Sequence, residues 1–258
     1  MIRAVIIGSG NVAEAFARAL PGCGVEVVQV YARNRERGVM VAAIAGCGYA
    51  DEPQRLASAE VYIAAVSDRA IGEVYEPLAI PDTAVALHVS GGQPMEAIPA
   101  KAAHRGVLYP LQTFTSGREV DFREIPLFVE ASDPFAAGLI DDLAHRLSRD
   151  VRRADTAQRV RIHAAGVFAC NFVNAMYGAG CEVARLADMP FEILKPLIME
   201  TARKACGCDD PRSVQTGPAV RGDRTTMERH LAMLDECGKE ELTEIYNIAS
   251  KYIANIAN

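Results

Sequence analysis

The stretch Gly8-Ser9-Gly10-Asn11-Val12-Ala13 decides the fold of this chain. It follows a run of mostly β-branched apolar residues, Ile2 to Ile7, and opens a segment whose apolar residues recur with helical spacing. Between a strand and a helix, G-x-G-x-x-G/A is a dinucleotide fingerprint, because its glycines allow a tight turn and a close approach of pyrophosphate to the backbone. A plain glycine turn is the alternative, but the context favours a dinucleotide site at Gly8, Ser9, Gly10, Asn11 and Val12.

The rest of the first half alternates short apolar runs with helical patterns. Strands that are apolar almost throughout are typical of a parallel sheet covered on both faces. The predicted strands are Ile2 to Ile7, Val25 to Tyr31, Val61 to Val66, Ala84 to Val89, Gly106 to Leu108 and Leu127 to Glu130. The predicted helices are Val12 to Leu20, Arg35 to Ala45, Ala70 to Leu78 and Phe135 to Leu147. This alternation predicts an α/β fold, a doubly wound Rossmann domain.

The second half reads as helix, because the strand signal ends at about Asp133. Helix breaks are predicted at Asp188-Met189-Pro190, at Asp209-Asp210-Pro211, through Thr216 to Asp223 and at Cys237-Gly238. We therefore expect a Rossmann domain in residues 1–150 and an all-α domain in residues 151–258. The second domain is expected to help form the substrate site and a homodimer through its helices.

The charge and the cysteine content of the chain indicate which kinds of partner it binds and in which cellular compartment it works. A net charge of −6 and a pI near 5.5 argue against nucleic-acid binding, which depends largely on Lys and Arg. Seven scattered cysteines and the lack of a signal segment indicate a reducing cytoplasm, and the single-residue spacing of Cys206 and Cys208 predicts no metal site. The uncharged stretch His163 to Cys181 carries Asn171 and Asn174 in its middle, so we expect a helix buried in the protein or at a dimer seam, and no membrane span.

Residues at the ends of the second and third confident strands indicate which dinucleotide binds. An NAD site usually offers an acid after the second strand, whereas this chain has Arg33-Asn34-Arg35, which can hold a 2′-phosphate. We therefore expect NADP(H) in preference to NAD(H), the alternative being two solvated arginines at a helix start. Val66, Ser67 and Asp68 are expected beneath the cofactor, although Asp68 could instead cap a helix beginning at Arg69.

Two later strand ends and one distant loop are candidates for contacting a small substrate. We expect Ser90 and Gly91 in one strand-end loop, and Tyr109, Gln112 and Thr113 in the next, to lie near the nicotinamide end of the cofactor. Both loops could also be purely structural turns. Far along the chain, Arg221 could bind a carboxylate with Asp223 orienting it, or the two could form a loop salt bridge, and Thr225 and Glu228 read as a capping box.

The apolar helix after residue 162 supplies the candidate catalytic residues, His163 and Asn171. Reduction of a carbonyl needs a proton donor or a hydrogen-bonding group near the oxygen, and a His or an Asn can supply one of these. In an α-helix the two lie about 12 Å apart along the axis, so both can hardly touch one carbonyl. Asn171 is the better candidate for touching the reacting group, and His163 could equally be a satisfied core histidine.

With these motifs in order, the whole chain resembles bacterial oxidoreductases that join a Rossmann-like domain to a helical domain of unknown function. Those proteins resemble pyrroline-5-carboxylate reductases, 6-phosphogluconate-type dehydrogenases and ketopantoate reductases, in which the helical domain dimerises and completes the active site. The resemblance implies reduction of a ketopantoate-like oxo acid or an imine. In ketopantoate reductases a catalytic Lys precedes an Asn by one turn, but here Val167 stands four residues before Asn171, so the proton must come from His163, Tyr109 or water.

The sequence thus predicts an NADP(H)-dependent oxidoreductase that reduces a small oxo acid or imine by hydride transfer. The missing lysine keeps open a sensor or interaction protein that binds NADP(H) without turnover. A dimerisation module with a vestigial cofactor groove is a third reading.

Overall fold

The computed structural model describes residues 1–256. It divides into two compact units, one ending at Asn171 and the other beginning at Phe172. The first unit contains the whole sheet, including its last strand β8 (Val151–Arg153), and helix α5 (Thr156–Gly166). Both β8 and α5 come after Asp150, near which the domain boundary was expected.

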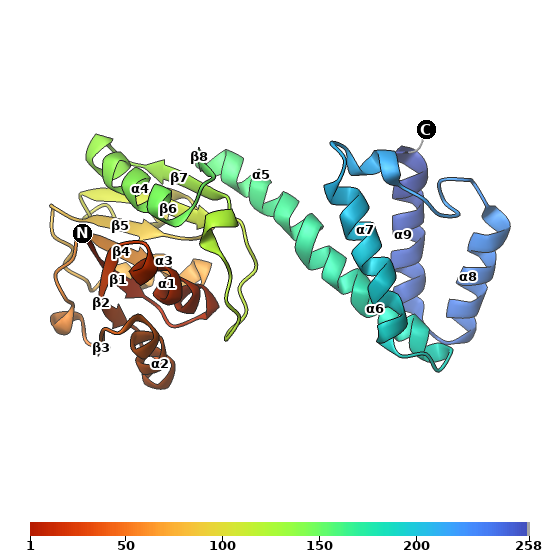
Figure 1. The fold of residues 1–258 in the computed structure, drawn as a ribbon, viewed down its shortest axis with the longest axis horizontal. Coiled ribbons are helices and arrows are strands. Elements are labelled where there is room, and N and C mark those ends of the chain that lie inside the picture. The colour runs from red at the N-terminus through yellow and green to blue at the C-terminus, as the bar shows by residue number, and fades with distance from the viewer. Residues whose placement is uncertain (257–258) are drawn as a thin grey trace. The chain divides into compact units, whose positions relative to one another are not determined.

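The first unit is built on one eight-stranded sheet in the order β3-β2-β1-β4-β5-β6-β7-β8 (Figure 1). Neighbouring strands are parallel except β6 and β7, which are antiparallel. The remaining strands are β1 (Ile2–Ile7), β2 (Val25–Tyr31), β3 (Gly48–Ala50), β4 (Val61–Ala64), β5 (Val85–His88), β6 (His104–Pro110) and β7 (Leu127–Ala131). This is the strand order of a doubly wound dinucleotide-binding sheet, so the predicted α/β fold is confirmed.

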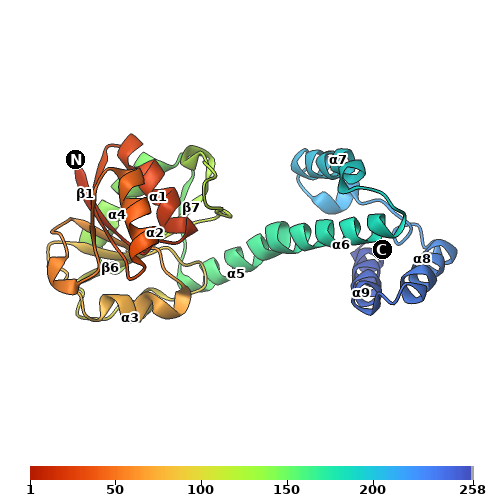
Figure 2. The same ribbon diagram turned by 90° about the horizontal axis from the view of Figure 1, so that it is seen from below.

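Helices cover both faces of that sheet. Helices α1 (Asn11–Gly22), α2 (Arg35–Ala45) and α4 (Pro134–Leu147) lie on one face, and the short α3 (Ile71–Tyr75) lies on the other (Figure 2). Successive strand residues alternate between the two resulting cores: Ile6 and Ile63 point to α1 and α4, whereas Val5 and Tyr62 point to α3. Burial on both faces explains why these strands carry no polar alternation.

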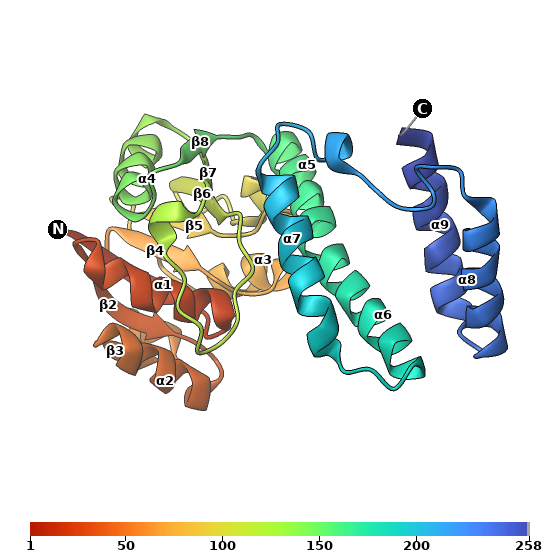
Figure 3. The same cartoon turned by 45° about the vertical axis from the view of Figure 1, so that its right-hand side comes forward.

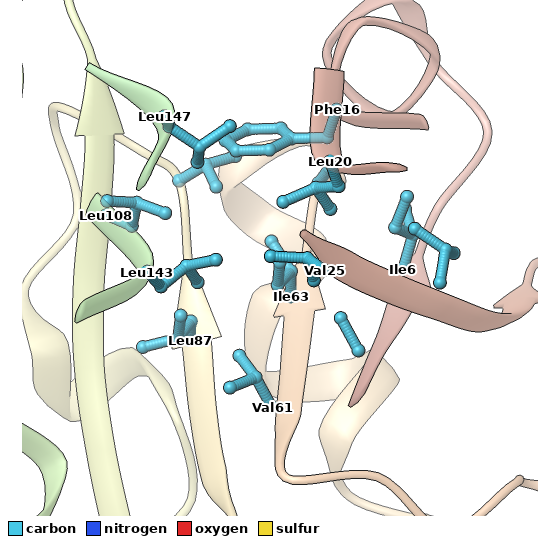
Figure 4. Close-up of a cluster of buried hydrophobic side chains, with 14 of the residues drawn as sticks. Ile6, Phe16, Leu20, Val25, Val61, Ile63, Leu87, Leu108, Leu143 and Leu147 are labelled. Atoms are coloured by element: carbon cyan, nitrogen blue, oxygen red, sulfur yellow. The ribbon is translucent and has the colours of Figure 1, made fainter. Parts of the chain in front are cut away.

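The larger core lies between the sheet and helices α1 and α4 (Figure 4). Phe16 and Leu20 of α1 and Leu143 and Leu147 of α4 are fully buried there. Since burying one such side chain stabilises the fold by about 1.5–3 kcal/mol, this layer fixes the start of α1, and with it the glycine loop, against the sheet.

Two strands of this unit were missed, and two predictions were wrong in detail. Strands β3 and β8 were not predicted, because three residues are too few to show a pattern, and the arginines of β8 are exposed at the sheet edge. The strand signal therefore does not end at Asp133. The predicted helix Ala70 to Leu78 is a 3₁₀ turn, Asp68–Ala70, followed by α3, which ends before Pro77.

The second unit is helical throughout its regular structure, from α6 (Val173–Leu186) through α7 (Lys195–Cys206) to α8 (Arg224–Glu236) and α9 (Glu240–Ile256). Helices α8 and α9 lie side by side (Figure 3). All four predicted helix breaks are confirmed. The predicted capping box at Thr225 is wrong: α8 begins earlier, and the side chain of Asp223 caps it by accepting from the Thr226 N–H at 3.1 Å.

Within residues 1–256, no helix combines the length and the apolar character that a membrane crossing requires.

Candidate nucleotide and substrate site

A cleft of about 530 Å³ opens in the first unit at the carboxyl ends of β1, β2 and β4. In a doubly wound sheet this edge is where a dinucleotide binds. The cleft is lined by Gly8, Ser9, Gly10, Asn11 and Val12 of the first loop, by Tyr31, Ala32, Arg33 and Asn34, by Ala65, Val66 and Ser67, and by Ala70, Glu73, Val74 and Pro77. It therefore brings together nine of the eleven residues that the sequence assigned to the cofactor.

The glycine loop has the geometry that an approaching pyrophosphate requires. Gly8 has a φ of +119°, and a Cβ there would lie 2.3 Å from the carbonyl oxygen of Ala65, so only glycine fits. Gly10 is the N-cap residue of α1, and no side chain caps this helix. A Cβ on Gly10 would meet no atom within 4 Å. The first turn of α1 thus has no side-chain cap and borders the cleft through Gly10, Asn11 and Val12, which suits a phosphate oxygen.

The basic segment after β2 is exposed, and two of its three residues line the cleft. Arg33 and Asn34 are lining residues, whereas Arg35 lies next to the cleft as the first residue of α2. Asn34 caps α2, because its Oδ1 accepts the Arg37 N–H at 3.0 Å. Its side-chain oxygen is therefore committed to the helix, and the charge offered to a 2′-phosphate comes from the arginines.

A buried carboxylate that the sequence analysis missed organises this region. Glu14 of α1 is 3% exposed and pairs with Arg18 at 3.0 Å and Arg37 at 3.2 Å. It also accepts from the hydroxyl of Ser116 at 2.8 Å and from the N–H of Gly117 at 2.9 Å. Burial alone would raise the pKa of Glu14, but the hydrogen bonds from Gly117, Arg18 and Ser116 lower it to about 2.

The same network joins the glycine loop to the loop that follows β6. Arg37 donates to the carbonyl of Ser9 at 3.3 Å and to the hydroxyl of Ser116 at 3.2 Å. Asn11 donates through Nδ2 to the carbonyl of Phe114 at 3.1 Å. The only signal in the sequence was an acid on the apolar side of the first helix with Arg18 four residues later, and this spacing is common on solvated helices.

Beyond the third strand end, Ser67 lines the cleft and Asp68 does not. The alternative in which Asp68 caps a helix beginning at Arg69 is wrong, because Asp68 is itself the first residue of the 3₁₀ turn. Its Oδ2 accepts from Nε2 of Gln93 at 3.4 Å and lies 3.4 Å from the position of a Cβ on Gly92. Asp68 thus connects the β4 end to the loop after β5.

A second pocket, of about 250 Å³, is lined by residues of the β6 end and of helix α5 with the π-helical turn Val167–Phe172 that follows it. Five of the predicted substrate-binding and catalytic residues line this pocket, namely Tyr109, Gln112, Thr113, His163 and Asn171. Cys170, which was not predicted, also lines it. π-helical turns often occur at functional sites, and here the turn carries Cys170 and Asn171 to the pocket.

Tyr109 and His163 form a hydrogen-bonded pair in this pocket. The Tyr109 Oη lies 3.0 Å from His163 Nδ1, and the two rings meet edge to face at 5.9 Å. Tyr109 is 8% exposed, and burial raises the pKa of its hydroxyl, whereas His163 is exposed. A Cβ on Gly91 would lie 2.6 Å from the Tyr109 ring, so the backbone of Gly91 packs directly against it.

Ser90 and the buried His88 shape the loop after β5. The Ser90 hydroxyl oxygen accepts the N–H groups of Gly92 and Gln93, both at 3.1 Å, and Ser90 is in neither pocket lining. His88 Nδ1 accepts the Ser90 N–H at 3.2 Å, and Nε2 donates to the carbonyl of Pro94 at 3.1 Å. Burial lowers the pKa of His88 to about 4, so it is a neutral structural residue.

The contacts of this loop make the two pockets neighbours along one sheet edge. Asp68 follows Ser67 of the cleft and contacts Gly92 and Gln93, and Gly91 contacts Tyr109 of the second pocket. Arg221 belongs to the second unit and is exposed, and its role as a carboxylate ligand stays a prediction. Asp223 is engaged as the α8 cap and also accepts the Thr226 hydroxyl at 2.7 Å.

Two family models match this chain. Residues 125–253 match a "Domain of unknown function (DUF2520)". Residues 3–90 match the model described as "NADP oxidoreductase coenzyme F420-dependent". No curated protein matches the chain.

Solved structures match the chain over nearly its whole length. A structure described as that of an NADP oxidoreductase from Bacteroides fragilis is 37% identical, with 98% of each chain covered and a TM-score of 0.90. An imine reductase from Streptomyces aurantiacus is 15% identical over 98% of this chain and 95% of that one, with a TM-score of 0.66. A pyrroline-5-carboxylate reductase from Coxiella burnetii is 17% identical over 100% and 98%, with a TM-score of 0.57.

Proposed function

Because the chain belongs to the family of oxidoreductases in which an NADP oxidoreductase segment precedes this domain of unknown function, we propose that it reduces a small C=O or C=N compound with NADPH. One observation supports this most strongly. An uncapped helix N-terminus behind a glycine-only turn opens into a nucleotide-sized cleft, and a second pocket with five polar side chains lies at the carboxyl end of β6, on the same edge of the sheet.

The preference for NADPH rests on Arg33 and Arg35. Arg33 lines the cleft beside Ala32, and Arg37, the third arginine, is already engaged by Glu14, Ser9 and Ser116. Replacing Arg33 and Arg35 together by Ala should raise the Kd for NADPH tenfold or more and leave that for NADH within twofold, since charge-assisted bonds to the 2′-phosphate contribute about 1.5–3 kcal/mol each. An unchanged preference for NADPH would contradict the assignment.

The substrate pocket offers hydrogen bonds and has no Lys or Arg among its lining residues. NADPH, when bound, supplies the hydride. Asn171 is proposed to hydrogen-bond the oxygen or nitrogen being reduced, while Gln112 and Thr113 orient the substrate. Val167 lines the pocket where some related reductases carry a lysine, so the protonating group is a different one.

An imine is favoured over an oxo acid, because imine and pyrroline-5-carboxylate reductases share this fold over the whole chain. A carboxylate substrate such as ketopantoate needs a cation, and Arg221 is the proposed one. The test is NADPH consumption with a panel of cyclic imines, ketopantoate and coenzyme F420, with NADH run alongside.

Asn171→Ala separates an enzyme from a nucleotide sensor. Turnover by the natural chain that falls at least tenfold in the variant, with an unchanged Kd for NADPH, supports the reductase. Tight NADPH binding without turnover of any compound favours the sensor, and failure to bind NADPH at all favours a dimerisation module with a vestigial groove.

We also propose that the second unit associates with a second copy of the chain. Among its described residues only Ala219 and Leu234 are buried apolar residues, while Leu197, Ile248 and Tyr252 are 64%, 71% and 64% exposed. Exposed apolar faces of this kind mark association surfaces. Leu197→Asp with Ile248→Asp should halve the mass measured by light scattering, whereas Val39→Asp in the first unit should not. A natural chain that is monomeric at micromolar concentration would refute the proposal.

The compartment proposed is the cytoplasm. All seven cysteines are unpaired in the structure, which suits a reducing environment.

A further inference from the structure

Tyr109 and His163 form a hydrogen-bonded pair whose two members are positioned by separate, well-packed elements of the first unit. Tyr109 stands on strand β6 at the carboxyl end of the sheet, while His163 stands on helix α5, 54 residues later. Their 3.0 Å hydrogen bond joins a buried hydroxyl to an exposed imidazole. The Tyr109 hydroxyl is therefore shielded from water, whereas the His163 ring is in contact with it.

A single loop fixes both members of the pair. Gly91 packs against the ring of Tyr109, where no side chain would fit. Two residues later, the carbonyl of Gln93 accepts from Arg159 at 2.9 Å, and Arg159 lies one helical turn before His163. The loop after β5 therefore sets the position of Tyr109 and of helix α5 together.

Arg159 makes the helix side of this arrangement rigid. Its side chain is 0% exposed, pairs with Glu130 of β7 and donates to the carbonyl of Ala154 at 3.3 Å. A buried guanidinium with these partners tolerates little movement, because losing Glu130 would leave its charge uncompensated away from water, and losing a carbonyl would leave a buried N–H without an acceptor. Helix α5 is thus fastened to the sheet one turn from His163.

We propose that the hydroxyl of Tyr109 is the proton donor in the reduction, and that His163 returns the proton to it from solvent through Nδ1. The inference rests on the proposed function and selects one donor at that site. In this step the hydroxyl of Tyr109, which lines the pocket, contacts the substrate and is the catalytic group, whereas His163 acts through Tyr109 as a positioning and proton-returning residue.

The step balances. Hydride adds to the carbon of the C=O or C=N bond, the π electron pair moves to oxygen or nitrogen, and that atom takes the proton from Oη of Tyr109. The phenolate then takes the Nδ1 proton of the His163 imidazolium, which becomes a neutral imidazole, and the exposed ring takes up a proton from solvent to restore the imidazolium. A phenol can protonate the product anion, because an alkoxide or amide ion is a far stronger base than a phenolate.

Burial favours Tyr109 over His163 as the direct donor. Burial raises the pKa of the Tyr109 hydroxyl, so it stays protonated throughout the neutral range. Asn171 in the same pocket can hydrogen-bond but cannot release a proton. The exposed His163 is suited to exchange with water, which is the task that the relay gives it.

The decisive variant is Tyr109→Phe, and the chain offers a matched control. His230 and Tyr246 of the second unit form a pair of the same kind, with Nδ1 and Oη 2.8 Å apart and the rings 5.6 Å apart, and neither residue lines the cleft or the substrate pocket. With a reducible cyclic imine as probe, Tyr109→Phe should lower kcat at least 100-fold, as general acids contribute about 10²–10⁴-fold. Tyr246→Phe should change kcat less than twofold, and both variants should keep the Kd for NADPH within twofold.

Two further measurements test His163. In mixtures of H₂O and D₂O the rate of the natural chain should depend on deuterium fraction with the curvature of two transferred protons, and His163→Gln should make the dependence linear. Without turnover, the ¹³Cζ signal of labelled Tyr109 should respond to pH between roughly 5 and 8, where imidazoles change charge, and lose this response in His163→Gln.

The outcomes separate the two proposals. If the natural chain binds NADPH but reduces no compound of the panel, the proposed function fails and the relay with it. If the natural chain turns over and Tyr109→Phe keeps more than a quarter of its kcat, Tyr109 is not the donor and the reductase stands. A ¹³Cζ signal of Tyr109 that titrates identically in His163→Gln overturns the role of His163.

Discussion

Replacing Glu14 by Gln should lower the free energy of unfolding markedly at neutral pH and much less at acid pH. The carboxylate is 3% exposed and is held by Arg18, Arg37, Ser116 and the N–H of Gly117. These partners lower its pKa from 4.5 to about 2 against the opposing effect of burial. A depression of this size corresponds to about 3 kcal/mol of folding free energy, because each pKa unit is worth about 1.4 kcal/mol.

The sign of the pH dependence follows from the direction of the shift. A carboxyl whose pKa is lower in the folded state stabilises the fold above its unfolded value of 4.5, and this stabilisation disappears as pH falls from 4.5 towards 2. The free energy of unfolding of Glu14→Gln should therefore lie about 3 kcal/mol below that of the natural chain at pH 7 and only about 1 kcal/mol below it at pH 3.

Urea unfolding followed by far-UV circular dichroism measures both values, since the chain has no Trp to report by fluorescence. Asp142→Asn is the matched control, because Asp142 pairs with Arg146 at the same i,i+4 spacing but is half exposed, and exposed pairs contribute about 0–1 kcal/mol. A loss below 1 kcal/mol at pH 7, or one as large at pH 3 as at pH 7, would refute the reasoning.

Three other substitutions test separate parts of the structure. Gly8→Ala places a Cβ 2.3 Å from the Ala65 oxygen at a φ of +119°, so the NADPH Kd measured by fluorescence titration should rise at least tenfold, whereas Gly138→Ala, in open space on α4, should not change it. Gly91→Ala must displace the Tyr109 ring and should lower kcat tenfold or more with little change in NADPH affinity; equal activity would show that the ring position is not required. Asp223→Ala removes the α8 cap and should cost about 1 kcal/mol of unfolding free energy without affecting NADPH binding, and an unchanged melting temperature would contradict this role.

The fold was largely predictable because its signals are local. The glycine motif, six strands and the helix Arg35–Ala45 all follow from spacing within a few residues of one another. What failed was short or irregular, namely the three-residue strands β3 and β8 and the helix around α3. In each of these places tertiary contacts, and not local pattern, determine the structure.

The candidate site was predictable where its residues follow strand ends, and unpredictable where its residues meet through distant contacts. Loops that follow parallel strands must meet at one sheet edge, and so nine of the eleven residues predicted to hold the cofactor line the cleft, although Arg35 and Asp68 do not. The buried Glu14 was not foreseen, because its partners Ser116 and Gly117 are about a hundred residues away. Arg37 was overlooked for the same reason, although it stands two residues from the predicted phosphate ligand Arg35.

The second pocket, with Tyr109, His163 and Asn171, shows why site chemistry is hard to predict from spacing alone. Reasoning with regular α-helix geometry set His163 and Asn171 too far apart to serve one group, and that expectation stays a prediction. It did not foresee the π-helical turn Val167–Phe172 or that both residues line one pocket. Tyr109 meets His163 where the buried Arg159, one turn earlier, fastens α5 to the loop that also supports the Tyr109 ring. An arginine in a polar helix start gives no sign in the sequence that it will be fully buried. The residue that aligns the proposed proton donor with its partner is therefore one that touches neither.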